Sequence, residues 1–344
     1  MDGTFQPEDL ELFMRLVIRN RRPEALPAWV RWMDQALFYA RRVLQRNTAS
    51  SAKSNVAHHY DISDELYRVF LDTDMQYSCA YFPRADMTLE DAQAAKKAHI
   101  AAKLALEPGM RVLDIGCGWG GMALTLARDH GVEVTGVTLS ENQLGTAIAR
   151  AEAAGVAERT RFRLQDYRAI QDNFDRVVSV GMLEHVGLPH YSEYFDQVAR
   201  LLNADGVALI HTIGRAAPPH TPSPWFDKYI FPGGYIPSLS ELAGPIEYAG
   251  LVTCDIEFWR LHYAKTVRHW QKRFNARIDH VRDMYDERFV RMWTYYLVAC
   301  LMAFEEQPHG VFQFQLSKSL QTLPLTRDYL YGPTDTARAV AAAE

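Results

Sequence analysis

The sequence contains few cysteines, and they lie far apart. Four occur in 344 residues, at Cys79, Cys117, Cys254 and Cys300, and no two form a Cys-x-x-Cys pair. A disulfide framework and a zinc finger both need closely spaced cysteines, so this spacing argues against both. We therefore expect a protein of a reducing, cytoplasmic compartment, and no metal site.

Long apolar runs and a strong charge of one sign are also absent. No run approaches the ~20 apolar residues that a membrane span needs, and the first residues lack the basic and apolar stretches of a secretory leader. The net charge of −5 predicts no broad basic surface for nucleic acid. With 48% apolar residues, the chain can bury a large core in one elaborated domain or two.

The N-terminal region differs from the rest in charge. Residues 1–50 contain eight Arg and six Asp or Glu, a balance of +2, which leaves −7 for the remainder. Apolar spacing predicts helices over 7–19 and 27–45, and residues 27–46 combine four Arg with two Trp. Such a helix suits a membrane surface, but it equally suits packing on a main domain with solvated Arg side chains, which we favour slightly.

A polar stretch at 47–54 is the best candidate linker. We therefore expect a helical region over 1–53, with a candidate membrane or dimer contact, and a main domain over 54–344.

The main domain alternates apolar strands with helical segments. Strands are expected at 111–115, 132–137, 161–164, 175–181 and 207–213. This alternation predicts an α/β fold with a parallel sheet and helices on both faces. Ligands of such sheets bind beyond the carboxyl ends of the strands. That edge collects Gly116, Gly118, Thr138, Asp166, Glu184 and His211.

A glycine-dense turn follows the first of these strands. The run Val-Leu-Asp-Ile-Gly-Cys-Gly-Trp-Gly-Gly at 112–121 breaks a strand and opens a helix, which is the geometry of a cofactor cradle. A dinucleotide site expects an acidic residue about 20 positions later, but the next strand ends in Thr-Leu-Ser at 138–140. Asp114 instead stands two residues before the first glycine, which looks like the first motif of S-adenosylmethionine (SAM) methyltransferases.

Residues 215–245 hold seven prolines among several aromatic residues. Long connections in compact domains are usually functional or disordered, and the aromatic content argues against disorder. We expect an apolar lid or channel wall here, followed by a strand near 251–259 and helices near 263–275 and 286–307.

Two segments are Tyr-Ser-Cys-Ala-Tyr at 77–81 and Glu-His-Val-Gly at 184–187. Together with further matches, they resemble motifs of the cyclopropane fatty-acyl-phospholipid synthases and the mycolic acid cyclopropane synthases, and of all the matches these two are the most specific. The resemblance covers about residues 54–320. The further matches are at 59–63, 87–93, 113–120, 136–143, 211–214, 231–234 and 262–266.

The resemblance implies a Rossmann-like SAM methyltransferase fold with a mostly parallel, seven-stranded sheet. It implies that SAM is bound by a set of residues in this sequence: Tyr60, Ser78, Asp114, Gly116, Gly118, Thr138, Leu139, Gln143 and, facing the adenine, Asp166 with Tyr167. Gln143 would take the ribose in place of the missing acid, and Trp119 is a further candidate for the same pocket.

Family members transfer the SAM methyl group to a cis alkene of an acyl chain. Because an alkene is a poor nucleophile, the reaction depends on holding donor and acceptor in near-attack geometry. The resulting carbocation must lose a proton to close the ring. The resemblance implies that a bound bicarbonate ion accepts it, held by Glu184, His211, Tyr263 and the backbone at Cys79 and Ile213.

Several alternatives stay open. The same cation gives a methyl-branched or methylene chain if it is resolved differently, and the scaffold also suits small-molecule methyltransferases or a lipid-binding module without turnover. Our first hypothesis is an enzyme of the inner membrane surface acting on unsaturated phospholipid acyl chains, with a homodimer as one option. The chain departs from the family at its front end, where some members carry a full domain.

Overall fold

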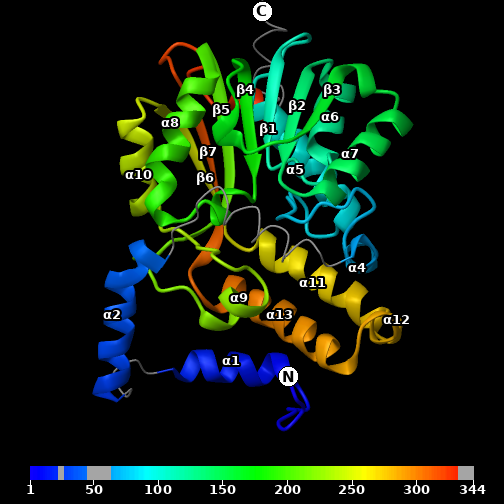
Figure 1. Cartoon of the computed structure of the whole chain (residues 1–344), viewed down its shortest axis with the longest axis vertical. Coiled ribbons are helices and arrows are strands. Elements are labelled where there is room, and N and C mark those ends of the chain that lie inside the picture. Colours follow the sequence, from blue (N-terminus) through cyan, green and yellow to red (C-terminus); the bar gives the residue numbers. More distant parts are fainter. Residues whose placement is uncertain (22–26, 45–62, 332–344) are drawn as a thin grey trace, which may run out of the picture.

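A seven-stranded sheet forms the centre of the computed structural model (Figure 1), which describes residues 1–21, 27–44 and 63–331. The strand order is β3-β2-β1-β4-β5-β7-β6, and β7 alone of these runs antiparallel to its neighbours. The strands are β1 (Arg111–Ile115), β2 (Glu133–Thr138), β3 (Thr160–Leu164), β4 (Phe174–Val180), β5 (Leu202–Arg215), β6 (Val252–Trp259) and β7 (His309–Ser317).

The central strand β1 is apolar on both faces because helices cover both sides of it. Val112 belongs to the cluster under α5, α6 and α7, whereas Leu113 belongs to the cluster under α8 and α10. Strands buried on both faces read as continuous apolar runs, as β1 does. The covering helices are α5 (Leu89–Lys103), α6 (Gly121–His130), α7 (Glu141–Ala153), α8 (Tyr191–Leu201) and α10 (Leu239–Tyr248).

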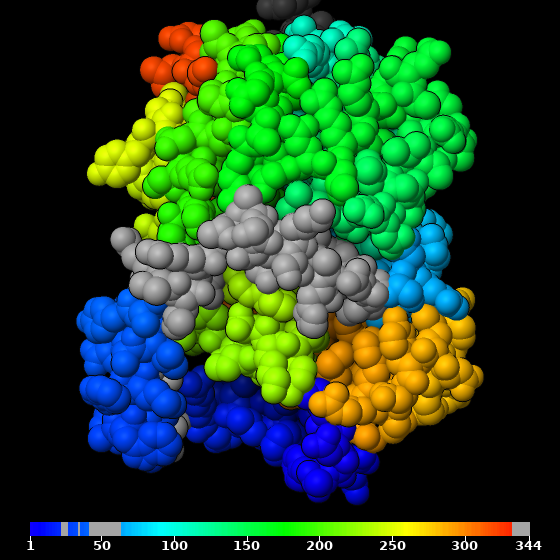
Figure 2. Space-filling model, viewed as in Figure 1, coloured from blue at the N-terminus to red at the C-terminus, as the bar shows by residue number. Residues whose placement is uncertain are grey.

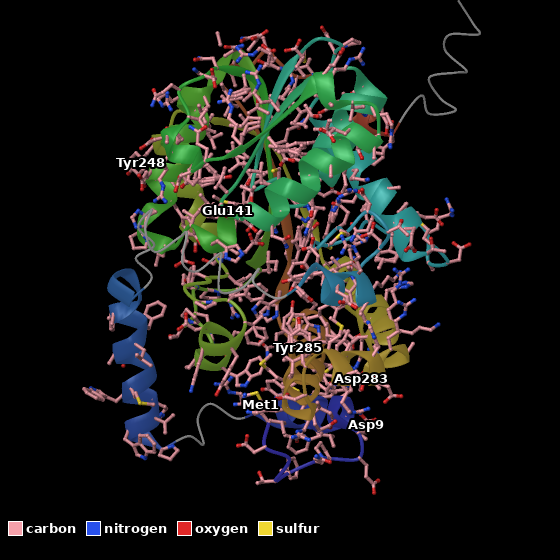
Figure 3. All side chains as sticks on the ribbon, turned by 45° about the vertical axis from the view of Figure 1, so that its right-hand side comes forward. Met1, Asp9, Glu141, Tyr248, Asp283 and Tyr285 are labelled. Carbon is pink, nitrogen blue, oxygen red and sulfur yellow. The ribbon has the colours of Figure 1, made fainter. Side chains whose placement is uncertain are left out.

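A second layer, the helical cap, lies beyond the carboxyl ends of the parallel strands (Figure 1). Its largest apolar cluster reaches the sheet through Trp119, which follows β1, and Trp259, which ends β6. Glu141, which opens α7 directly after β2, and Tyr285, in the cap, lie on either side of this boundary (Figure 3). The cap contains α1 (Leu10–Asn20), α4 (Asp64–Phe70), α9 (Pro224–Tyr229), α11 (His262–Ala276), α12 (Ile278–Met284) and α13 (Glu287–Glu306).

The N-terminal helices lie on the outside of this cap, at the end of the molecule away from the sheet (Figure 2). Helix α1 packs on α13, and α2 (Ala28–Leu44) stands beside the cap and touches η5 (Leu188–His190). The expected linker at 47–54 lies outside the residues that the structure describes. The remaining short helices are η2 (Ala157–Arg159), η3 (Tyr167–Ala169), η4 (Leu183–His185) and η6 (Asp328–Leu330).

The segment expected to form a lid, 215–245, divides into two parts. Its middle forms α9, in which Trp225 packs edge-on against Tyr295 of α13 at 4.6 Å. Its last residues open α10, where Ser238 and Glu241 form a capping box, and this helix packs on α8 over the sheet. A role as lid therefore rests on α9 and its flanks, and it stays a prediction.

Candidate active site

The turn between β1 and α6 forms an open cradle. Gly116 and Gly118 have positive φ angles of 78° and 54°, a backbone region that favours glycine. The Gly116 and Cys117 amides both donate to the Val137 carbonyl, each at 3.0 Å, which fixes the turn against the end of β2. A Cβ atom on Gly118 would meet no atom within 4 Å, so this residue faces empty space.

The empty space is a pocket at the carboxyl ends of β1, β2 and β4. Nine of the sequence-predicted cofactor residues line it, as does Trp119: Ser78, Asp114, Gly116, Gly118, Thr138, Leu139, Gln143, Asp166 and Tyr167. Tyr60 lies outside the described residues. The pocket thus brings together positions from separate segments of the chain.

Asp114 is the most unusual group in this pocket. Its side chain is 2% exposed, and its Oδ2 atom has no hydrogen-bond partner within the described part of the chain. Burial raises the pKa of this carboxyl to about 7. A buried carboxylate without a cation is costly, so Asp114 fits a cationic ligand such as the ammonium group of SAM.

Polar groups at the ends of β2 and β3 are held in place by their neighbours. The Thr138 hydroxyl donates to Oε1 of the Gln143 side chain at 2.9 Å. Ser140 caps α7, because its hydroxyl oxygen accepts from the backbone N–H of Gln143. Asp166 accepts from the Arg168 guanidinium at 2.6 Å. These pairs orient Gln143 and Asp166 at the pocket wall.

Sequence reasoning missed part of the opposite wall. Residues 75–78 line the pocket, but only Ser78 was assigned to it. Met75 has a positive φ of 55°, which side chains rarely adopt, and Asp72 accepts from the Gln76 amide at 2.7 Å. The motif match at 77–81 was the available signal. Arg168 and His185 also line the pocket without having been assigned to it.

Glu184 is a buried carboxyl in η4, the short helix that follows β4. Its Oε1 atom accepts from the Ile213 amide at 2.6 Å, while Oε2 has no partner among the residues described. Burial raises the pKa of Glu184 to about 7, opposed by the bond from Ile213. The structure therefore brings two of the predicted bicarbonate residues into direct contact, through the Ile213 backbone that was expected to face the ion.

His211 lies two residues before Ile213 on β5, so both side chains emerge on the same side of the strand. The Gln313 amide of β7 donates to Nδ1 of His211 at 3.0 Å, and Trp259 packs edge-on against the ring. Burial, with help from nearby lysines, holds the pKa of His211 well below its usual value. The ring is neutral, and with Nδ1 accepting, its proton sits on Nε2.

Tyr263 and Cys79 lie in the apolar cluster of the cap, which Ile213 also contacts. The Tyr263 ring stacks on Phe304 at 4.5 Å. Burial raises the pKa of the Cys79 thiol, which donates to the Ala80 carbonyl. A thiol that stays protonated is a poor nucleophile, which agrees with a role for Cys79 through its backbone.

No helix among the described residues is long and apolar enough to span a membrane. The described part of the chain also holds no group of three or more His, Cys, Asp or Glu side chains arranged to bind a metal ion.

Comparison with known proteins identifies the family. The profile of the mycolic acid cyclopropane synthetase family matches residues 47–314. The cyclopropane-fatty-acyl-phospholipid synthase of Escherichia coli K12 is 41% identical over 321 residues, covering 93% of this chain and 82% of that protein. A probable fatty acid methyltransferase of Pseudomonas putida is 38% identical over 292 residues, covering 80% of this chain and 73% of that protein.

Solved structures agree with this assignment. A mycolic acid cyclopropane synthase, CmaA1, in complex with SAH (S-adenosylhomocysteine) and CTAB superposes with a TM-score of 0.73 at 33% identity, covering 77% of this chain and 98% of that one. The expected fold, a mostly parallel seven-stranded sheet behind a helical N-terminal region, is confirmed. The chain belongs to the mycolic acid cyclopropane synthetase family and is a SAM-dependent methyltransferase.

Proposed function

We propose that this protein converts cis double bonds in phospholipid acyl chains to cyclopropane rings, with SAM as the one-carbon donor. The observation that carries the proposal is Glu184, a buried carboxyl with one free oxygen on the same edge of the sheet as the cofactor pocket. Methyl transfer to an amine needs no such group, whereas ring closure must remove a proton from an alkyl cation. The names of the Escherichia coli synthase and of the mycolic acid cyclopropane synthase CmaA1 support the same chemistry.

The pocket fits SAM on two observations. Asp114 offers a buried oxygen without a partner among the described residues, and Gly118 leaves the space that a side chain would fill. Asp114 would hold the ammonium group, Gln143 the ribose, and Asp166 with Tyr167 the adenine. When bound, SAM supplies an activated methyl group.

Glu184, His211 and Tyr263, with the backbone at Cys79, would hold bicarbonate. The Ile213 backbone, the fifth predicted member, would act through Glu184, because its amide donates to Glu184 Oε1. The free Oε2 of Glu184 can accept a hydrogen bond from a hydroxyl, and the Nε2–H of His211 can donate a hydrogen bond to an oxygen, so this set suits an ion that has both groups. Bicarbonate would supply a proton acceptor beside the apolar cluster of the cap, in which the Tyr263 ring packs against Trp270 and Phe304.

The outer face of α1, formed by Leu12, Phe13, Leu16 and Val17, is the proposed contact with the membrane. These four side chains are 40–53% exposed, although they are apolar. The charged side chains of α1 pair with α13: Arg15 with Glu305 at 2.6 Å and with Glu306, and the partly exposed Arg19 with Glu306. Leu10, Met14 and Ile18 already pack on the cap cluster, so the four exposed residues form a second apolar face, which favours an apolar partner.

A lipid bilayer is the partner that fits this face best. Helix α2 exposes Trp29 and Trp32, 67% and 73% respectively, and residues 28–44 hold three Arg against one Asp. Aromatic and basic residues together favour an anionic membrane surface. Both helices lie at the cap end of the molecule (Figure 1), beyond the strand ends where an acyl chain must arrive. We propose peripheral attachment at the cytoplasmic face, with a homodimer as the competing use of this surface.

A second candidate keeps SAM and the alkene but gives a methyl-branched or methylene chain. The probable fatty acid methyltransferase of Pseudomonas putida, at 38% identity, favours keeping it. The two candidates differ only in which proton the cation loses or whether it is reduced.

The test is mass spectrometry of acyl chains after the purified protein is incubated with SAM and vesicles of cis-unsaturated phospholipid. The proposal predicts a gain of one CH₂ with loss of the alkene. A surviving alkene with the same gain indicates a methylene or an unsaturated branched product. A gain of CH₂ plus two hydrogens without an alkene indicates the reduced, branched chain, and no gain with any unsaturated lipid contradicts an acyl-chain substrate.

A further inference from the structure

A buried lysine stands behind the cofactor pocket and has no assigned role. Lys96, in the middle of α5, is 0% exposed, an unusual position for an ammonium group. It donates to Gln76 Oε1 at 2.6 Å and to Ser78 Oγ at 2.8 Å. Both acceptors are neutral, so neither bond is an ion pair that would explain the burial of Lys96.

The same face of α5 holds the pocket wall through a second residue. Gln93, one turn before Lys96, donates to the carbonyls of Gln76 and Ser78 at 3.3 and 2.9 Å. These bonds and those of Lys96 tie α5 to the segment 76–78, which lines the pocket. Gln93 fixes the backbone of this segment, and Lys96 fixes its side chains.

The contact between Lys96 and Ser78 sets the direction of the serine hydroxyl. An ammonium group donates and has no lone pair to accept with, so Ser78 Oγ must be the acceptor in this bond. The hydroxyl hydrogen of Ser78 is then available to donate elsewhere, and Ser78 lines the cofactor pocket. A donor in this position suits an anionic group of the ligand.

The charge of Lys96 also reaches Asp114. Desolvation raises the pKa of Asp114, and the Lys96 ammonium opposes that shift. Charged Lys96 therefore favours the ionised form of Asp114, which is the form that receives a cation. The two effects act on opposite ends of an amino acid: Ser78 on its carboxylate and Asp114 on its ammonium.

We propose that Lys96 is a positioning residue for the amino-acid end of SAM, acting through Ser78 and Asp114. This inference rests on the SAM site and not on the acyl substrate. A failure of the acyl-chain assay therefore leaves it standing, and the reverse also holds.

The pH dependence of the charge on Lys96 provides a second test of its role. The charge of the Lys96 ammonium interacts with several titratable groups packed around it. Asp72 and Asp74 lie in the loop before the pocket wall, Lys97 is on the same helix and Cys79 follows the wall. Asp114 and His211 interact with it as well. Burial lowers the pKa of Lys96 to about 8, with the two loop carboxylates opposing the shift. Above that pH a neutral amine no longer fixes the hydroxyl or favours the Asp114 carboxylate.

The experiment compares two ligands by calorimetry, SAH and adenosine, of which only SAH carries the amino-acid end. In Lys96→Met we expect SAH affinity to fall at least tenfold while adenosine affinity stays within twofold. The matched control is Lys103→Met, which removes another fully buried lysine from α5 that pairs with Asp255 and Glu257. It should leave both affinities within twofold.

Two results would overturn the proposal: an equal loss for both ligands in Lys96→Met, which indicates a structural role, or no loss of SAH affinity. If Lys96→Met does not fold, the parent protein supplies the second measurement. Its SAH-to-adenosine affinity ratio should fall as the pH rises through 8, and Lys96→Arg, which keeps its charge, should remove that fall. An unchanged ratio between pH 7 and 9 contradicts the proposal.

Discussion

Two buried carboxyls define this site at the scale of single residues. Burial raises the pKa of both Asp114 and Glu184 to about 7, and each keeps one oxygen without a partner within the described ranges. Asp114 lies in the cofactor pocket, whereas Glu184 bonds to the β5 backbone near His211. Strongly shifted pKa values are typical of functional groups, and we propose that Asp114 marks the cofactor site and Glu184 the site of the proton acceptor.

The Glu184→Gln variant should bind SAH with near-parental affinity but lose at least a hundredfold in turnover, because its oxygen is taken by the Ile213 amide and its NH₂ group cannot accept from a hydroxyl. In the parent, turnover should rise with pH around an apparent pKa of about 7, since the carboxylate is the active form. Turnover assays between pH 5.5 and 8.5 check this. Parental turnover in the variant would show that Glu184 is not part of the proton acceptor's site.

The same variant should gain stability. An unfolded Glu ionises near pH 4.5, whereas the folded carboxyl stays protonated to about pH 7, so the parent loses stability as the pH rises between these values. The uncharged amide of the variant avoids this loss, and at pH 8 the free energy of unfolding should rise by up to about 3 kcal/mol. Urea titrations of both proteins at pH 5 and pH 8 measure the difference, and an equal effect at both pH values would contradict it.

Sequence reasoning reached most of these residues but not Lys96. The sequence predicts the cofactor residues because the ends of parallel strands converge at one edge of the sheet. The signals are the glycines, the acidic residue before them and the polar residues that follow strands. Charged residues on a helix normally face water, so no pattern marks Lys96 as buried. The direct bond between Glu184 and the Ile213 amide was also unreadable, because it depends on how η4 turns after β4.

At the scale of elements, we predict that the turn between β1 and α6 binds the cofactor. Gly118→Val should weaken SAH binding at least a hundredfold, since a branched side chain fills the open cradle. The positive φ adds strain of about 1–2 kcal/mol. Calorimetry with SAH measures the loss. Gly155→Val, an exposed glycine with a φ of 66° and open space around it, is the matched control for strain alone. Equal SAH binding in Gly118→Val and the parent would contradict the cradle.

The elements that escaped sequence reasoning share a cause. Strand β7 was not assigned from the sequence. Its apolar residues alternate with Gln313 and Gln315, which are polar, although the structure buries both glutamines. Helix α10 begins in a proline-rich stretch and contains Pro245, which is unfavourable inside a helix. Tertiary packing on the sheet stabilises both, and packing is not visible in a local pattern.

Helix α1 gives a prediction for membrane attachment. Leu16→Asp places a charge on the proposed contact face and should lower binding to anionic vesicles at least fivefold in a sedimentation assay. Leu320→Asp is the control, because Leu320 is 74% exposed and follows β7 at the opposite end of the sheet. Unchanged vesicle binding with a shift from dimer to monomer would assign the face to a second copy of the chain instead.

At the scale of the whole molecule, the sheet holds the cofactor pocket and the cap supplies an apolar enclosure over it. The cap joins segments from both ends of the chain, since α1 packs on α13 and α4 on α11. Trp119 links the two layers: it lines the pocket, belongs to the apolar cluster of the cap and donates to Asp64 of α4 at 2.9 Å. The proposed cofactor site and the proposed acyl-chain site would therefore meet at this boundary.

The measurement that tests the central claim most directly uses SAM with a fully deuterated methyl group. Ring closure removes one hydrogen from that methyl group, so the account predicts an acyl product with two deuterium atoms, a cyclopropane ring and no alkene. A product that keeps all three deuterium atoms, or one that keeps an alkene, would contradict cyclopropane synthesis by this protein.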